Sequence, residues 1–198
     1  MERIVVGITG ASGSIYGKRT VEVLVANGYS VDLILSETGK KVFAYEIGVK
    51  VEDFVRELPQ EQVNLYNPDD LFAPPSSGSY RTTGMVIVPC SAGTLGHIAN
   101  GVTRNLIHRA ADVTLKERRP LVLVFRETPL NRVHVENMLK AMDAGATVLP
   151  ACPAFYGKPS SVKELVDFVV ERALRLLTGK SFNLLQEWEG SQPLRPTS

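Results

Sequence analysis

Short apolar runs, mostly β-branched, alternate along the chain with longer segments in which apolar residues recur every three or four positions. The short runs are typical of buried parallel strands, and the longer segments predict helices that cover a sheet. The predicted strands are 4–8, 31–35, 85–88, 121–125 and 147–149. The predicted helices are 15–27, a helix capped by Ser36, 51–58, 105–119, 133–144 and 161–177. This alternation predicts an α/β fold with a three-layer, doubly wound parallel sheet of the Rossmann-like or flavodoxin-like class.

One segment interrupts this alternation. Residues 67–83 include the run APPSSGS at 73–79, which is a loop by composition and long for a compact domain, so it is either functional or mobile. The strand pattern resumes directly after it, and we therefore expect a single domain over 1–198, with a C-terminal tail from about 181. Ligands of such sheets bind beyond the carboxyl ends of the strands, so we look for chemistry in the turns that follow strands 4–8, 85–88 and 121–125.

Composition narrows the function classes. The chain has 198 residues, is 44% hydrophobic and carries a formal net charge of +1, so no overall field favours nucleic acid. No apolar stretch approaches the roughly 20 residues of a membrane span. Two cysteines suggest neither a disulfide framework nor a zinc site, and the three histidines lack metal-ligand spacing. These features predict a cytoplasmic protein without a metal, a membrane span or a nucleic-acid partner.

The turn after the first strand is TGASGS at 9–14. Gly10 and Gly13 allow the backbone to approach a ligand, and the helix that begins behind them favours an anion. The same turn is typical of short-chain dehydrogenases, and it also occurs as a plain strand-to-helix connection. None of the six tyrosines has a lysine four residues later, so the dehydrogenase interpretation lacks its catalytic pair.

The turn after the strand at 85–88 is PCSAGT at 89–94. The hydroxyls of Ser91 and Thr94 lie one helical turn apart and can face one anion, although capping of the helix by Ser91 explains the same spacing. Two such turns in one sheet favour a phosphate-bearing mononucleotide that bridges them. Cys90 has no neighbour in the sequence that would activate it, so we do not expect it to be a nucleophile.

Basic residues suggest a second phosphate site. Arg126 ends a buried strand, where its charge needs either Glu127 or a ligand phosphate, and we favour phosphate. Arg109 and Lys116 share a helix face, but Asp112 on the same face makes internal ion pairing an alternative. For Arg172, spacing alone leaves ligand, partner subunit and water open.

Together these segments resemble the UbiX-type flavin prenyltransferases over nearly the whole chain. The matching stretches are GITGASGSIYG at 7–17, PCSAGTL at 89–95, RAADVTLKERRPLVL at 109–123, RETPL at 126–130 and PAFY at 153–156. The resemblance implies a dodecamer with each site at a subunit junction. It also implies that dimethylallyl phosphate alkylates reduced FMN at N5 and C6 without a metal, and that the prenylated FMN serves UbiD-type decarboxylases.

The resemblance also implies roles for individual residues. It assigns proton handling to Glu127, and Arg109, Glu46 and Ser12 would complete the reacting site. Trp188 would correspond to an aromatic residue that lines the site of a neighbouring subunit. The implied flavin contacts are Gly10, Ala11, Ser12, Ser36, Ser91, Ala92, Gly93, Thr94 and Arg126, and the implied prenyl phosphate contacts are Lys116, Arg126, Tyr156 and Arg172.

The implied chemistry fits these residue types. Fixed positive charge stabilises a leaving phosphate, and an aromatic face such as that of Tyr156 stabilises an allyl cation. The alternatives are a flavin-dependent decarboxylase of peptidyl cysteine or of an aromatic acid, and a protein that stores or delivers FMN. Cysteine decarboxylases typically carry an asparagine in the turn that here reads PCSAG, which argues against the first of these.

Overall fold

The computed structural model describes residues 1–185. Its centre is a parallel sheet of six strands in the order β3-β2-β1-β4-β5-β6. The doubly wound, Rossmann-like prediction is confirmed, and the strand order reverses direction between β1 and β4, where such sheets bind ligands. The strands are β1 (Arg3–Ile8), β2 (Ser30–Leu35), β3 (Val63–Tyr66), β4 (Gly84–Cys90), β5 (Leu121–Phe125) and β6 (Thr147–Pro150).

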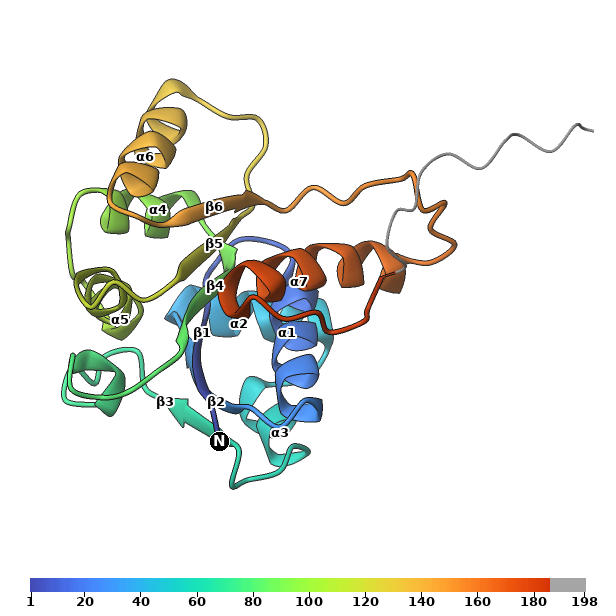
Figure 1. The fold of residues 1–198 in the computed structure, drawn as a ribbon, viewed down its shortest axis with the longest axis horizontal. Coiled ribbons are helices and arrows are strands. Elements are labelled where there is room, and N and C mark those ends of the chain that lie inside the picture. Colours follow the sequence, from blue (N-terminus) through green and yellow to red (C-terminus); the bar gives the residue numbers. More distant parts are fainter. Residues whose placement is uncertain (186–198) are drawn as a thin grey trace, which may run out of the picture.

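Helices cover both faces of the sheet (Figure 1). The core on one face joins the sheet to α1, α2, α3 and α7, and the core on the other face joins it to α4, α5 and α6. The helices are α1 (Ser14–Ala26), α2 (Glu37–Ile47), α3 (Val51–Arg56), α4 (Ala92–Ala99), α5 (Leu106–Lys116), α6 (Arg132–Asp143) and α7 (Val162–Thr178), with a short 3-10 helix η1 (Pro74–Ser76).

Most predicted elements agree with the structure to within a few residues, and the strand at 121–125 agrees at both ends. β3 was not predicted, and β4 continues through Pro89 to Cys90. α4 begins where a helix capped by Ser91 was expected. β3 is a four-residue edge strand in which only Val63 is buried, so it lacks the continuous apolar run that marks the central strands. The 67–83 segment is a loop, as predicted, apart from η1.

The start of the expected tail packs against α7. The carboxylate of Glu171, which is 2% exposed, accepts hydrogen bonds from the Ser181 hydroxyl and from the backbone N–H groups of Phe182 and Leu184. Trp188 lies outside the described residues. Within residues 1–185, no helix is long and apolar enough to cross a membrane.

Candidate functional site

Three turns meet where the strand order reverses. Residues 9–13 follow β1, residues 91–94 follow β4, and Arg126 follows β5, and these three strands are neighbours in the sheet. Because all strands are parallel, the turns lie together at the carboxyl edge. Ser36, after β2, lies at the same edge, and its backbone N–H donates to the carbonyl of Ile8 at 3.0 Å. The structure therefore brings together the expected flavin contacts.

Thr9, which the sequence analysis did not single out, joins two of these turns. Its side chain is buried, and its hydroxyl donates to the Pro89 carbonyl at 2.8 Å and accepts from the Ser91 N–H at 2.8 Å. Its backbone N–H also donates to the Pro89 carbonyl, at 3.2 Å. The first turn and the Ser91 turn therefore form one unit. A threonine after a strand carries no distinguishing signal in the sequence.

Thr9→Val is expected to weaken FMN binding by about tenfold. Valine keeps the shape but leaves the N–H of Ser91 and the carbonyl of Pro89 with fewer partners, at a cost of about 1–3 kcal/mol for a buried group. Thr9→Ser keeps the hydroxyl and should bind FMN almost as the wild type does. Flavin fluorescence titration measures both, and equal loss in the two variants would show that the methyl group matters instead.

The glycines of the first turn have two different functions. A Cβ on Gly10 would lie 2.6 Å from Cγ2 of Thr38 in α2, so Gly10 makes room for a neighbouring helix as well as for a ligand. Gly13 has a φ of 111°, which side chains rarely adopt. Its conformation turns the chain into α1, so that the N-terminus of the helix lies beside Ser12.

The anion at the start of α1 comes from the chain itself. The Glu46 carboxylate accepts from the N–H of Gly13 at 2.9 Å and from that of Ser14 at 2.8 Å. Partial burial would raise the pKa of Glu46, but hydrogen bonds from the Ser12 hydroxyl and from these backbone groups hold it below its ordinary value. Glu46 is therefore an anion at neutral pH, fixed next to Ser12. The sequence predicts a ligand anion at this helix start, whereas in the structure a carboxylate of the chain itself takes the N–H groups of Gly13 and Ser14.

Glu46→Gln is expected to lower the thermal midpoint at pH 7 by about 1–3 °C, because a neutral amide interacts less strongly with a helix N-terminus. A depressed carboxyl pKa contributes stability above the ordinary value of 4.5, and this stability is lost as the pH falls through the folded-state pKa. The gap between variant and wild type should therefore shrink below pH 4.5 in calorimetric scans. A gap independent of pH would contradict this account.

Ser91 and Ser36 each cap a helix. For Ser91, capping was the alternative to anion binding that the sequence left open. The Ser91 Oγ accepts from the N–H of Thr94 at 3.3 Å, and that of Ser36 accepts from Gly39 at 3.0 Å. The backbone N–H groups of Ala92 and Gly93 donate to no acceptor within residues 1–185. The same holds for Gly10, Ala11 and Ser12. These unpaired donors fit a phosphate-bearing ligand such as FMN.

Arg126 lies half-buried next to these donors, and its N–H donates to the Cys90 carbonyl at 3.1 Å. Among the described residues it forms no ion pair, so its charge stays available, as expected for a phosphate ligand. Glu127 is exposed and accepts from the N–H of Thr128 at 3.0 Å. Tyr16, which the sequence analysis missed, is close enough that the positive charge of Arg126 opposes the rise in its pKa caused by burial.

Tyr156 and Arg172 are placed in one region by α7. The ring of Tyr156 packs edge-on against Phe168, with 6.1 Å between centroids, and Phe168 lies one helical turn before Arg172. The side chain of Arg172 is exposed. A groove next to Tyr156 is lined by Ala154, Gly157, Pro159, Glu164, Phe168, Leu184 and Leu185.

Lys116 does not join the site within one copy of the chain, and Arg109 is engaged by other partners. α5 ends where β5 begins, so Lys116 lies at the amino edge, and the five residues of β5 separate the two edges by roughly 17 Å at about 3.3 Å per residue. Lys116 pairs with Glu117, while Arg109 pairs with Asp112 at 2.7 Å and donates to a carbonyl of η1. The predicted alternative of internal ion pairing therefore holds for Arg109, which pairs with Asp112. Lys116 is also paired, but with Glu117 and not with Asp112.

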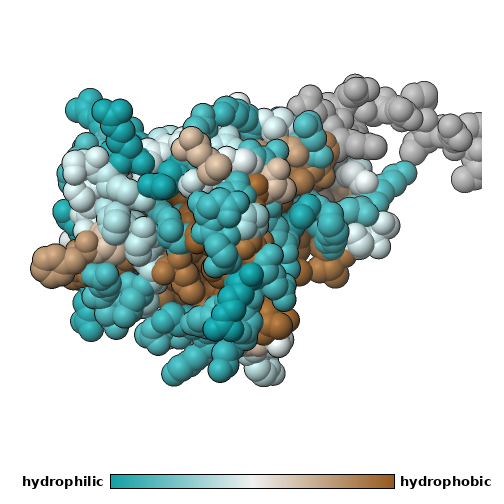
Figure 2. Space-filling model, turned by 90° about the horizontal axis from the view of Figure 1, so that it is seen from below, coloured by the Kyte–Doolittle hydropathy of each residue, from teal (hydrophilic) through white to brown (hydrophobic). Residues whose placement is uncertain are grey.

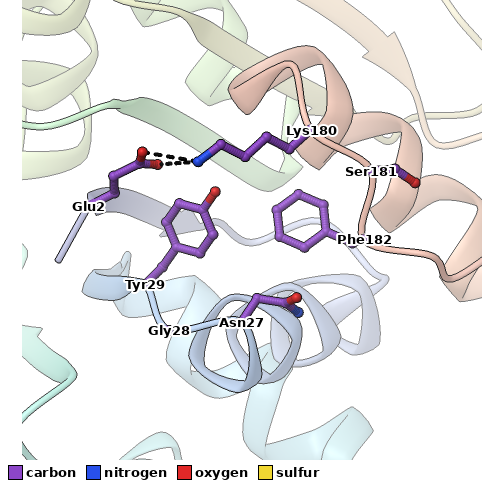
Figure 3. A pocket seen from close by; sticks show the side chains of 7 residues that line it. All are labelled: Glu2, Asn27, Gly28, Tyr29, Lys180, Ser181 and Phe182. Atoms are coloured by element: carbon purple, nitrogen blue, oxygen red, sulfur yellow. Dashed lines mark hydrogen bonds and ion pairs between the residues drawn. The ribbon is translucent and has the colours of Figure 1, made fainter.

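Other candidate groups lie apart from the site or are inert. Burial raises the pKa of Cys90 to about 12, which argues against a thiolate nucleophile. His97 and His108 stack with their centroids 4.4 Å apart, and no group of three potential metal ligands occurs within residues 1–185. A hollow around Tyr29 and the Glu2–Lys180 ion pair, whose shorter bond is 3.0 Å, lies where β1 and β2 begin (Figure 3).

Comparison with known proteins decides between the flavin-binding interpretations. A family model described as Flavoprotein matches residues 1–174. A flavin prenyltransferase UbiX from Halalkalibacterium halodurans is 48% identical over 189 residues, which cover 92% of this chain and 91% of the relative. The chain belongs to the UbiX-type flavin prenyltransferases. The resemblance seen in the sequence is thereby confirmed.

Solved UbiX-type structures share the fold closely. AnUbiX (PadA1), in complex with FMN and dimethylallyl pyrophosphate, matches with a TM-score of 0.91 at 39% identity, over 96% of this chain and 99% of that one. A dodecameric FMN-dependent UbiX-like decarboxylase from Escherichia coli O157:H7 matches with a TM-score of 0.89 at 38% identity, over 95% of this chain and all of that one (100%). The cysteine decarboxylase TvaF, at 16% identity and a TM-score of 0.61, shares the fold alone.

Proposed function

We propose that this UbiX-type chain joins the dimethylallyl group of dimethylallyl phosphate to N5 and C6 of reduced FMN. In this reaction the C–O bond to the phosphate breaks, and N5 and C6 of the flavin each form a bond to carbon and lose a proton. One proton adds to the prenyl double bond, and the other leaves with inorganic phosphate. The observation that carries the proposal is the group of unpaired donors of residues 10–12 and 92–93 beside the unpaired charge of Arg126, in a chain 48% identical to a flavin prenyltransferase.

Each site residue has a distinct role in this proposal. Gly10, Ala11, Ser12 and Ser36 hold the flavin from one side, and Ser91, Ala92, Gly93, Thr94 and Arg126 hold it from the other. Lys116, Arg126, Tyr156 and Arg172 bind the prenyl phosphate, and the positive charge of Lys116, Arg126 and Arg172 stabilises the leaving phosphate. The Tyr156 ring stabilises positive charge on the allyl group. Glu127, Glu46 and Ser12 orient groups and move protons at the reacting atoms, and Arg109 completes the site.

We further propose that each site is built from more than one copy. Lys116 and Arg126 lie at opposite edges of the sheet, so one phosphate can contact both only if they come from different copies. α6 presents an apolar surface: Val133 is 59% exposed, Val135 53%, Leu139 60% and Met142 56%. Apolar surface also reaches the solvent on another face, ringed by hydrophilic side chains (Figure 2). A homo-oligomer, with a dodecamer as the expected form, would cover such surfaces.

The cellular setting follows from the same proposal. The two cysteines are free, which supports a reducing cytoplasm. The product is passed to a UbiD-type decarboxylase, and the chain needs no metal, nucleic acid or membrane.

One experiment separates this function from its rivals. The protein is incubated without oxygen with reduced FMN and dimethylallyl phosphate, and the flavin is weighed by mass spectrometry. A prenyltransferase gives FMN heavier by one five-carbon unit in amounts exceeding the protein, whereas a storage protein returns unmodified FMN. A parallel reaction with 4-hydroxybenzoate and FMN tests decarboxylation by release of CO2. No adduct from either the phosphate or the pyrophosphate would refute the proposal.

A further inference from the structure

A buried charged cluster lies behind the 76–82 segment. Asp32, fully buried on β2, accepts from Nδ2 of Asn64 at 3.0 Å, and its second oxygen lies 3.8 Å from Nε of Arg3. The Arg3 guanidinium donates to the Tyr80 hydroxyl at 2.5 Å and lies 5.0 Å from the centroid of the same ring. Burial and the charge of Asp32 raise the pKa of Tyr80, so the phenol stays neutral. Tyr80 thereby anchors the segment to the sheet.

The same segment is held from the α5 side by two guanidinium groups. Arg119 donates to the carbonyls of Tyr80 at 2.8 Å and Gly78 at 2.7 Å. Arg109 donates to the carbonyl of Ser76 at 3.1 Å. Both arginines flank Lys116 in the sequence, so a shift of the segment would be transmitted directly to the basic end of α5.

Gly78 fits closely against Lys116. A Cβ at this position would lie 2.6 Å from Nζ of Lys116 and 2.3 Å from Oε1 of Glu117. The backbone of Gly78 is not in the left-handed region, so alanine adds no backbone strain there, and its Cβ displaces the two side-chain ends instead. The absence of a side chain at residue 78 therefore leaves the space that the Lys116 ammonium and the Glu117 carboxylate occupy.

Stability alone does not explain this arrangement. Nε of Arg3 and Oδ2 of Asp32 are buried without a hydrogen bond, and exchange of a buried ion pair for apolar side chains is often neutral or stabilising. What the cluster supplies is a defined position for the 76–82 segment, and through it for two cations. A role in orienting those cations accounts for both the buried charges and the close fit at Gly78.

We propose that the 76–82 segment positions Lys116 and Arg109 for the prenyl phosphate, with Tyr80 and Gly78 as positioning residues. This inference rests on the proposed function, in which Lys116 contacts the phosphate. The segment contacts the α5 region through Arg109 and Arg119, and within residues 1–185 none of its hydrogen bonds goes to the flavin turns at 9–13 and 91–94. Substitutions in the segment should therefore lower the affinity for the prenyl phosphate and leave the affinity for FMN unchanged.

Tyr80→Phe and Gly78→Ala test the inference. Each variant is loaded with oxidised FMN, which does not react, and dimethylallyl phosphate is titrated by calorimetry. We expect affinity for dimethylallyl phosphate to fall five- to tenfold in both variants, with FMN affinity unchanged within twofold. Tyr29→Phe is the matched control, since its ring packs on Phe182 away from α5. It should bind both ligands as the wild type does.

A second measurement separates positioning from general damage. In a Lys116→Ala background, Gly78→Ala should cause no further loss of phosphate binding, because the group that it displaces is absent. Unchanged phosphate affinity in both single variants, or an equal loss of FMN and phosphate affinity, would overturn the inference. If the wild type binds no dimethylallyl phosphate and forms no adduct, the proposed function itself fails; if it does both and the variants match it, only this inference fails.

Discussion

Lys116→Ala is expected to lose at least about 100-fold in turnover while binding FMN with unchanged affinity, in line with the loss when one charge-stabilising group is removed from a reacting site. Lys116 lies at the amino edge of the sheet, far from the unpaired donors of residues 10–12 and 92–93 in the same copy. It therefore contributes nothing to flavin binding by its own copy. Rates of adduct formation and a flavin fluorescence titration together measure the effect.

Lys116→Arg and Glu117→Gln make this prediction specific. Arginine keeps the positive charge and should retain part of the activity, although its larger planar group fits the space beside Gly78 less well. Glu117→Gln removes the present partner of Lys116 and should leave FMN binding intact. Loss of FMN binding in Lys116→Ala would show that Lys116 belongs to the flavin site instead.

Mixed oligomers of two inactive variants are expected to regain activity. Lys116→Ala and Arg126→Ala should each be inactive alone, because each removes a cation from every site. If a site takes Lys116 from one copy and Arg126 from another, random mixing restores both cations in about a quarter of the sites. Co-expression with two different affinity tags and sequential purification isolates the mixed assemblies for assay.

The controls for this experiment are the two variants mixed after purification, without exchange of subunits, and each variant co-expressed with itself. Neither should show activity above that of the single variants. Mixed assemblies that stay as inactive as their parents would mean that Lys116 and Arg126 act within one copy. That outcome would contradict the argument from opposite edges of the sheet.

The central strands could be predicted because burial on both faces demands continuous apolar runs. Leu121 to Phe125 is such a run, and its ends agree with the structure. β3 could not be predicted in this way, since only Val63 is buried and the strand lies at an edge. The start of α4 could be predicted, because Ser91 is a typical N-cap residue and caps that helix in the structure.

The strand-end turns of the site were also predictable, because parallel topology brings them to one edge. The sequence could not reveal that Glu46, more than 30 residues away, binds the start of α1, or that Thr9 links two turns, because both contacts depend on folding. Spacing in α5 showed that Arg109 and Lys116 share a face. Only the position of the end of α5 relative to β5 showed that Lys116 lies away from Arg126.

The bonds in the product test the central claim most directly. The wild-type protein is supplied with reduced FMN and carbon-13-labelled dimethylallyl phosphate without oxygen, and the released flavin is examined by NMR. The account predicts that the labelled unit is bonded to both N5 and C6 of the flavin, in more than one equivalent per chain. Labelled carbon that remains as prenyl phosphate or free alcohol, or that is attached to another flavin atom, would contradict it.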